Sequence, residues 1–215
     1  NGLERLVHHL RGIRIGVALG GGGARGMSHL GVLKALEHSG IVVDMIAGTS
    51  AGAMTGVFYA SGLDCDYSSN QFSTDLRPGW IFRHIARGSH WYLVYQYRRG
   101  QFDPMLRAYL RDWRLEQLAI PCMSVTVDLV GGDSVVRDRG DAIHAILESI
   151  NLPVISVPIL REGQALIDEL GLADREVEAA AGGFEAAVAG AVLRLLDGGG
   201  DRRGERLGEI HFALA

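Results

Sequence analysis

The sequence predicts an α/β fold that forms one domain around a mostly parallel sheet. The chain has 215 residues, of which 47% are hydrophobic and 21% charged. It is therefore long enough to bury a real core and too apolar to be a disordered chain. Over residues 1–60, apolar runs of strand length alternate with helical patterns, and the strands end in glycine-rich turns. Such alternation is typical of parallel strands joined by helices.

The first two strand–turn–helix units are the clearest part of the pattern. Residues 13–19 (IRIGVAL) predict a strand that ends in GGGGARG at 20–26. The helix that follows has a leucine-rich face and a stop at Gly40. Residues 41–47 (IVVDMIA) predict a second strand, which leads into GTSAG at 48–52 and a helix of small residues over 51–62.

The remainder of the chain predicts a mixture of helices and strands. Residues 102–113 predict a helix with Asp103 as N-cap and Pro104 at its first position. A second helix over 141–149 has Asp141 near its positive N-terminus. We expect further strands at 119–128, 133–137, 154–160, 164–168 and in the final EIHFALA, and a helix at about 172–196.

The composition excludes several classes of protein. Two cysteines, Cys65 and Cys122, are too few for a disulfide scaffold. A net charge of −4 and a pI near 6.1 argue against a general nucleic-acid binder. No apolar run reaches the roughly 18 residues needed to span a bilayer, and the first residues lack the apolar region of a secretory signal. We therefore expect a cytoplasmic location, with membrane association as an open alternative.

The turn at 48–52, Gly48-Thr49-Ser50-Ala51-Gly52, fits the pattern G-x-S-x-G. A serine on a sharp strand-to-helix turn has a strained backbone, and flanking glycines let the helix and strand approach closely. The turn places Ser50 at the sheet edge above a helix N-terminus, whose dipole favours developing negative charge. We interpret it as a nucleophile elbow; a tight turn without chemistry is the alternative.

The glycine-rich loop at 20–26 offers backbone N–H groups with no side chains in the way, so it suits an anion or a developing oxyanion. Its glycines also fit G-x-G-x-x-G, a dinucleotide fingerprint. That interpretation requires an acid after the second strand, and Asp44 does not follow the apolar run. A phosphate-binding Walker loop is excluded because its lysine and hydroxyl residue are absent. An oxyanion hole fits best; a nucleotide site and a turn without ligand remain alternatives.

Together the two motifs resemble the patatin-like phospholipase family, and most closely the bacterial relatives of neuropathy target esterase. The matching segments are GGGARG at 21–26, GTSAG at 48–52 and the intervening HLGVLKALE. The resemblance covers about residues 12–170 and implies a patatin-like three-layer sandwich with a mostly parallel central sheet. We expect a single patatin-like domain over 1–215, in which 171–215 is an atypical or truncated C-terminal part.

The resemblance also implies the site residues: a Ser–Asp dyad without histidine, and no metal or cofactor. Ser50 would be the nucleophile, and the catalytic acid would be Asp168, where the chain has Asp168-Glu169-Leu170 in place of the family's Asp-Gly-Gly or Asp-Gly-Ala. Asp128 and Asp133 are alternative acids, of which we interpret Asp128 as a turn residue, and His29 is an alternative base that we interpret as packed. The oxyanion hole would comprise Gly21, Gly22, Gly23, Ala24, Arg25 and Gly26, and the elbow Gly48, Thr49, Ala51 and Gly52.

The implied function is a serine acyl hydrolase, a phospholipase A- or lysophospholipase-like esterase. Asp168 would take the proton of Ser50, which would attack the ester carbonyl and form an acyl-enzyme. Arg25 would brace the loop or meet a phosphate. The alternative is a catalytically impaired module that binds lipid or a partner.

Residues 77–114 interleave cations with aromatic rings. They contain all three tryptophans, four of the six tyrosines and eight arginines. Such a mixture suits peripheral contact with anionic lipid headgroups, although single-stranded nucleic-acid binders use the same residue types. With the hydrolase assignment, we expect a phospholipid or lysophospholipid partner and no nucleic acid; a cap that covers the core is the alternative.

Overall fold

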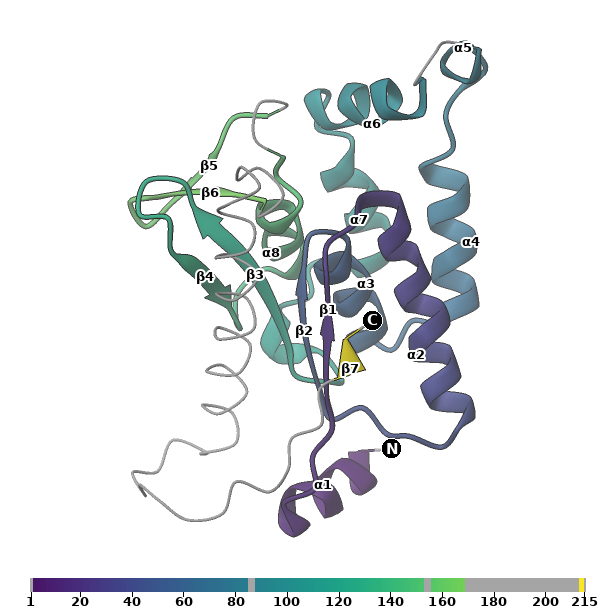
Figure 1. Ribbon diagram of the computed structural model, residues 1–215, viewed down its shortest axis with the longest axis vertical. Coiled ribbons are helices and arrows are strands. Elements are labelled where there is room, and N and C mark those ends of the chain that lie inside the picture. The colour runs from purple at the N-terminus through teal and green to yellow at the C-terminus, as the bar shows by residue number, and fades with distance from the viewer. Residues whose placement is uncertain (1, 85–87, 153–155, 169–212, 215) are drawn as a thin grey trace.

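The computed structural model describes residues 2–84, 88–152, 156–168 and 213–214 and shows an α/β fold around one sheet (Figure 1). Strands β1 (Gly16–Leu19), β2 (Met45–Thr49) and β3 (Cys122–Asp128) pair in parallel at its centre. This parallel centre was predicted from the sequence. β7 (Ala213–Leu214) pairs in parallel with β1, and three strands add antiparallel pairs beyond β3: β4 (Ser134–Arg137), β5 (Ile159–Arg161) and β6 (Gln164–Ile167).

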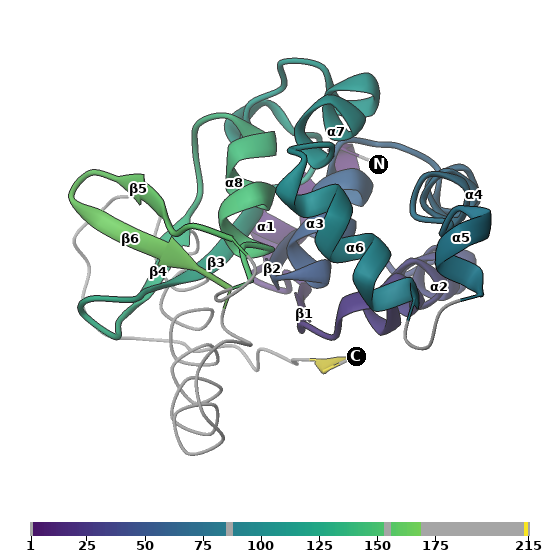
Figure 2. The ribbon, with the colours of Figure 1, turned by 90° about the horizontal axis from the view of Figure 1, so that it is seen from above.

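Helices cover the sheet and extend away from it (Figure 2). α3 (Ala51–Ala60) and α8 (Ala142–Ser149) contact each other and β3, so they share one face of the sheet. α2 (Ser28–His38) packs on α3 and on α4 (Cys65–Asp75). The other helices are α1 (Gly2–Arg11), α5 (Trp80–Arg83), α6 (Gly88–Arg98), α7 (Phe102–Leu110), and the 3-10 turns η1 (Gly23–Met27) and η2 (Leu115–Gln117). Within these described ranges, no helix is both long and apolar enough to cross a membrane.

The core lies around α3, every residue of which is buried. On its outer side, the ring of Phe58 packs on Phe72, with centroids 4.6 Å apart. On its sheet side, Gly56 has no room for a side chain, because a Cβ there would lie 2.9 Å from Ile46 Cγ2. Small residues thus let α3 lie close to the sheet, which fixes the turn that joins it to β2.

Strands β2 and β6 lie along the same edge of β3. Val125 of β3 pairs with residues of both β2 and β4, and Val127 pairs with residues of both β6 and β4. Because a strand has two edges, β4 occupies one of them, and β2 and β6 share the other. β2 runs parallel to β3 and β6 runs antiparallel to it, so the C-terminal ends of β2 and β6 approach each other.

The N-termini of α7 and α8 can be compared with the sequence predictions for these two helices. Asp141, predicted to lie near the N-terminus of this helix, is the N-cap of α8, and its carboxylate accepts the N–H of Ile143 at 2.8 Å. The predicted cap of α7 is wrong: the helix begins at Phe102, and its cap is Gln101. Asp103 instead accepts a hydrogen bond from Arg107 Nε at 2.9 Å, one turn later. The helix predicted at 172–196 lies outside the described residues.

Candidate active site

Ser50 lies on a strained turn between β2 and α3. Its backbone has φ 54° and ψ −125°, in a region that residues other than glycine rarely adopt and that costs about 1–3 kcal/mol. Such strain persists only where the surroundings hold it. The geometry is that expected of a serine presented at the end of a strand, directly before a helix N-terminus.

The glycines that flank Ser50 are required by close backbone approach. A Cβ on Gly52 would lie 2.1 Å from the carbonyl oxygen of Leu19, at the end of β1. A Cβ on Gly48 would lie 2.5 Å from the backbone carbonyl of Gly52. The intervening Thr49 is buried, and its hydroxyl donates to the Val125 carbonyl at 3.3 Å. The two glycines of the G-x-S-x-G pattern are therefore needed at the two places where backbones come into contact and fix the turn.

Ser50 and Asp168 form a direct hydrogen bond. The Ser50 hydroxyl donates to Asp168 Oδ2 at 2.6 Å, across 118 residues of sequence. Both residues are buried, with 4% and 1% of their surface exposed. Ser50 directly follows β2 and Asp168 directly follows β6. The two strand ends that approach each other along β3 therefore carry the serine and the carboxylate.

The residues before Asp168 account for its position. Ile167 pairs with Val127 of β3, and the N–H of Asp168 donates to the carbonyl of Asn151 at 2.8 Å. Glu169 and Leu170 lie outside the described residues. The carboxylate thus meets the serine although the chain lacks the glycines that follow this aspartate in the family pattern.

The glycine-rich loop lies beside the serine turn. It leaves β1 at Gly20 and continues into η1, with Gly22 at φ 159° and Gly23 at φ 55°. Gly26 touches the first residue of α3, since a Cβ there would lie 2.4 Å from Ala51 Cβ. Among the described residues, none accepts a hydrogen bond from the N–H of Gly22 or Gly23. Gly21, Gly23, Ala24 and Arg25 are exposed.

The alternative acids and bases have other partners. Buried His29 pairs through Nε2 with the carbonyl of Gly20 at 2.9 Å, so it contacts the loop. The Asp128 carboxylate accepts the N–H of Ala165 at 3.0 Å and of Val130 at 3.2 Å, which is the turn role predicted for it. Buried Asp44 accepts the N–H of Ile15 at 2.7 Å. These contacts are those of structural residues.

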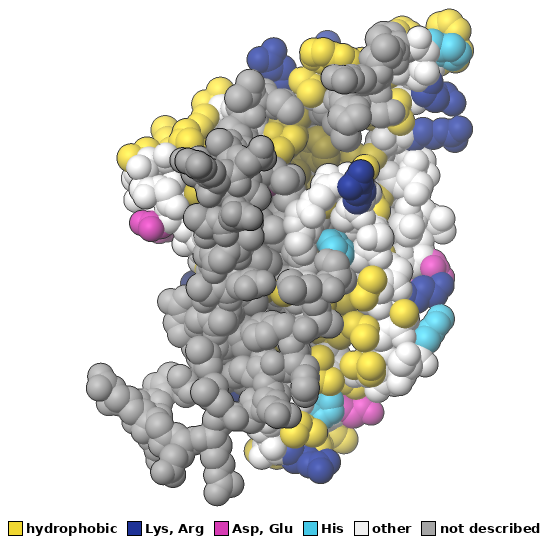
Figure 3. Space-filling view, viewed as in Figure 1, with side chains coloured by type: hydrophobic (Ala, Val, Ile, Leu, Met, Phe, Trp, Pro, Cys, Tyr) yellow, Lys and Arg dark blue, Asp and Glu magenta, His cyan; other side chains and the backbone are white. Residues whose placement is uncertain are grey.

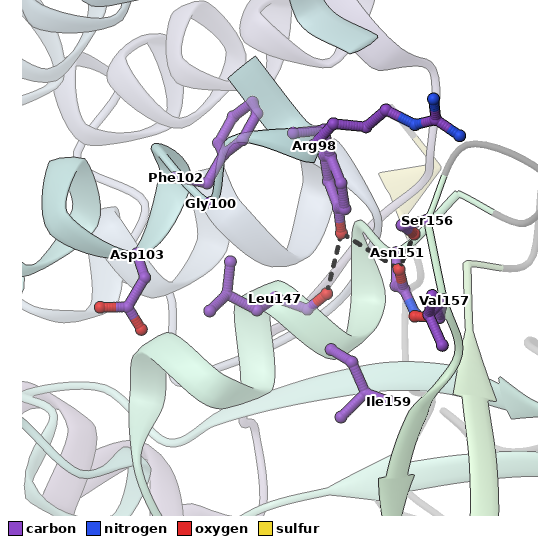
Figure 4. A pocket seen from close by; sticks show the side chains of 10 residues that line it. Arg98, Gly100, Phe102, Asp103, Leu147, Asn151, Ser156, Val157 and Ile159 are labelled. Atoms are coloured by element: carbon purple, nitrogen blue, oxygen red, sulfur yellow. Dashed lines mark hydrogen bonds between the residues drawn. The ribbon is translucent and has the colours of Figure 1, made fainter. Parts of the chain in front are cut away.

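A cavity of about 610 Å³ (Figure 4) is lined in part by Asn151, whose backbone carbonyl accepts the N–H of Asp168. Its walls come from the end of α6, the start of α7, the end of α8 and the segment before β5, and Asn151 and Tyr97 are among its lining residues. The Tyr97 hydroxyl donates to the carbonyl of Leu147 at 3.3 Å, and burial and then the negative charge of Asp168 raise its pKa. Ser50 and Asp168 are not among the lining residues, so the cavity adjoins the Ser50–Asp168 pair through Asn151, which lines the cavity and binds Asp168.

Sequence reasoning missed two residues that bind the backbone of Ser50 and Asp168. Ser149 accepts the N–H of Ser50 at 2.7 Å, and Asn151 holds the N–H of Asp168. Both are buried, at 0% and 1% exposed. A serine and an asparagine near a helix end give no local signal that distinguishes them from ordinary capping residues.

The model of one protein family, described as patatin-like phospholipase, matches residues 17–168. The lysophospholipase NTE1 of Kluyveromyces lactis is 35% identical over 179 residues, which cover 78% of this chain and 12% of that protein. The lysophospholipase NTE1 of Mycosarcoma maydis is 33% identical over 168 residues, covering 76% of this chain and 9% of that protein. An uncharacterized NTE family protein of Mycobacterium tuberculosis is 28% identical over 175 residues, which cover 78% of this chain and 28% of that protein.

The similarity is therefore to one part of longer proteins, since the chain spans between 9% and 28% of these relatives. Among solved structures, VipD from Legionella pneumophila has a similar fold, with a TM-score of 0.50 and 15% identity over 76% of this chain and 48% of that one. The family match runs from β1 to the aspartate that meets Ser50 and covers well over half of the sequence. The chain belongs to the patatin-like phospholipase family.

Proposed function

We propose that this chain is a serine acyl hydrolase in which Ser50 is the nucleophile and Asp168 the general base. The observation that carries the proposal is the 2.6 Å hydrogen bond from the Ser50 hydroxyl to the Asp168 carboxylate. That distance is within the reach that a general base needs for the proton it removes. The strained position of Ser50 before α3 supports the same role.

In the proposed reaction, Asp168 accepts the Ser50 proton as Oγ attacks the ester carbonyl. The tetrahedral intermediate collapses to an acyl-enzyme, and the leaving alcohol takes the proton from Asp168. Water then attacks the acyl-enzyme, with Asp168 again as base, and the departing Ser50 recovers its proton. Base catalysis of this kind contributes about 10²–10⁴ in rate.

The glycine-rich loop is the proposed oxyanion hole. The N–H groups of Gly22 and Gly23 have no acceptor among the described residues, and contact between Gly26 and Ala51 holds the loop at the serine turn. Preorganised N–H donors of this kind each contribute about 10²–10³ in kcat. The N-terminal end of α3 adds a positive dipole at the same place.

The proposed substrates are phospholipids or lysophospholipids. The family name and the lysophospholipase relatives support this class. The adjoining cavity, whose lining includes Phe102, Leu147 and Ile159, suits the apolar part of a lipid.

Release of fatty acid from lysophosphatidylcholine and phosphatidylcholine tests the proposal. Ser50→Ala is expected to abolish the release, and Asp168→Asn is expected to lower kcat by about 10³–10⁴. Ser39→Ala, which changes an exposed serine, is the matched control and is expected to retain full activity. Equal activity in Ser50→Ala and the native chain would contradict the proposal. A folded native chain that binds these lipids without hydrolysing them would favour the impaired binding module.

We infer further that α5 and α6 meet an anionic membrane surface. These helices carry four large side chains that are 42–70% exposed, hereafter called the α5–α6 patch: Trp80, Ile81, Trp91 and Tyr95. Between Asp75 and Asp103 the sequence has five arginines and no acidic residue, although the whole chain has a net charge of −4. Figure 3 shows hydrophobic and basic side chains together at the upper end of the molecule, where Figure 1 places these helices. Aromatic rings beside cations suit the headgroup region of a bilayer.

Vesicle sedimentation tests this contact. We expect stronger binding to vesicles that contain phosphatidylserine than to phosphatidylcholine alone, and weaker binding in high salt. The double variant Trp80→Ala/Trp91→Ala should weaken binding by at least about tenfold, because burial of a large apolar side chain contributes about 1.5–3 kcal/mol. Trp113→Ala, at 39% exposure outside the patch, is the control. Equal binding by both variants would contradict the assignment.

A further inference from the structure

We propose that Ser149 and Asn151 are positioning residues that hold the two members of the dyad against each other. The idea rests on the function proposed above for Ser50 and Asp168. The segment 149–151 begins at Ser149, the last residue of α8, and both Ser149 and Asn151 are buried. It contacts the backbone of both dyad residues, although these lie 118 residues apart in sequence.

Ser149 fixes the serine turn to the central strand. Its hydroxyl oxygen accepts the N–H of Ser50 at 2.7 Å, and its proton goes to the carbonyl of Val125 at 2.6 Å. The hydroxyl therefore has one defined orientation, with its donor and acceptor roles both used. Because Ser50 has a strained backbone at φ 54°, its N–H needs a fixed partner if the turn is to keep that conformation. Ser149 is that partner.

Asn151 fixes the carboxylate side. Its backbone carbonyl accepts the N–H of Asp168 at 2.8 Å. Its side-chain amide donates to the backbone carbonyls of Leu166 at 2.9 Å and Val157 at 3.2 Å. Its side-chain oxygen accepts from the Ser156 hydroxyl. One buried side chain thus ties the end of β6 and the segment before β5 to the end of α8. These bonds fix the end of β6, which Asp168 directly follows.

The arrangement also assigns the N–H of Ser50 a structural task. Because that N–H is bonded to Ser149, it is already used, and the oxyanion donors have to come from the glycine-rich loop or from α3. Loss of the Ser149 hydroxyl is therefore expected to act on the geometry of Ser50 and Asp168 and to leave substrate binding nearly unchanged. A misplacement of about 1 Å at a reacting group lowers the rate by about 10²-fold.

The test compares Ser149→Ala with Ser124→Ala. Ser124 is a buried serine on β3 whose hydroxyl donates to the carbonyl of Ala145 at 2.8 Å. Its removal deletes a buried hydroxyl from the same interface between α8 and β3 but does not touch the dyad. Both variants are expected to lower Tm by about 2–10 °C.

The proposal predicts that Ser149→Ala lowers kcat by about 10–100-fold with KM within about threefold of the native value. Ser124→Ala should keep kcat within about twofold, and Ser149→Thr, which retains the hydroxyl, should recover most of the activity. Asn151→Ala keeps the backbone carbonyl that accepts the N–H of Asp168 but removes the side-chain bonds to Leu166, Val157 and Ser156. It should therefore lower kcat less than Ser149→Ala does, again with little change in KM. If Ser149→Ala does not fold, Ser149→Cys replaces it, because the thiol is a weaker acceptor in a similar volume.

Equal kcat values for Ser149→Ala and Ser124→Ala would overturn the positioning role, and so would a loss confined to KM. These results differ from a failure of the proposed function. In that case the native chain itself would show no hydrolysis that depends on Ser50, whatever residue stands at position 149.

Discussion

Gly52→Ala is expected to reduce activity far more than its size suggests. The added Cβ would lie 2.1 Å from the carbonyl oxygen of Leu19 and 2.7 Å from that of Gly20. Both neighbours are backbone atoms, so neither can turn away as a side chain would. Ordinary contact distances are about 3.5 Å or more, which means that the start of α3 and the end of β1 must separate by more than about 1 Å.

That separation acts on the candidate site from both sides. Gly52 is two residues beyond Ser50, and Gly20 begins the glycine-rich loop. Moving them apart moves Ser50, the proposed nucleophile, away from the proposed oxyanion donors, which should lower kcat by about 10²-fold. The overpacking itself should destabilise the fold by about 1–3 kcal/mol. At about 2–4 °C per kcal/mol for a chain of this size, Tm should fall by about 2–12 °C.

The assay is ester hydrolysis and thermal unfolding of Gly52→Ala beside Gly31→Ala. Gly31 lies within α2, and a Cβ there would have nothing within 4 Å. Gly31→Ala should therefore keep full activity and gain about 0.5–1 kcal/mol of stability, as expected for alanine in a helix. The reasoning would be refuted if Gly52→Ala had native kcat and native Tm.

Three further variants test other parts of the structure. Glu148→Ala removes a buried carboxylate that pairs with Arg137 at 2.9 Å and Arg161 at 3.3 Å. Chemical denaturation should show a loss of about 1–3 kcal/mol, because two half-buried guanidinium groups lose their charged hydrogen-bond partner, and a loss below about 0.5 kcal/mol would contradict this. His29→Phe removes the contact to the Gly20 carbonyl. The kcat should fall about tenfold or more, because the start of the glycine-rich loop loses a contact that positions it, and an unchanged kcat would contradict this. Glu116 has a pKa of about 2, because backbone N–H groups, its own and that of Gly140, and then the Arg114 guanidinium favour its ionised form. Its folded pKa lies below the unfolded value, so its stabilisation is present above about pH 4.5 and is lost as the pH falls toward 2; acid titration of Glu116→Gln should show a weaker pH dependence in that window, and an identical curve would contradict the assignment.

The serine turn and the glycine-rich loop were predictable because their constraints are local. Gly48 and Gly52 each lie two residues from Ser50, at positions where a neighbouring backbone leaves no room for a side chain. A short sequence pattern can carry that information. The parallel centre of the sheet was predictable for a similar reason, since strand and helix patterns alternate along the chain.

The placement of Asp168 depends on long-range pairing that no local pattern contains. It follows from the position of β6 on the same edge of β3 as β2. Ser149 and Asn151 were missed for the same reason, because their partners lie 99 and 17 positions away in sequence. The cap of α7 was misplaced because Asp103 has a competing partner in Arg107, one turn along the helix. Helices α4 to α6 lie in a stretch of mixed aromatic and polar residues whose helical pattern was not identified.

Covalent labelling by a fluorophosphonate, with the modified peptide identified by mass spectrometry, tests the central claim most directly. Such a probe reacts with an activated serine, and buried serines without a base do not react. We predict one phosphonylated residue, Ser50, in the native chain, greatly slowed labelling in Asp168→Asn, and none in Ser50→Ala. No adduct on Ser50 in a folded native chain, or labelling as fast in Asp168→Asn as in the native chain, would contradict the account.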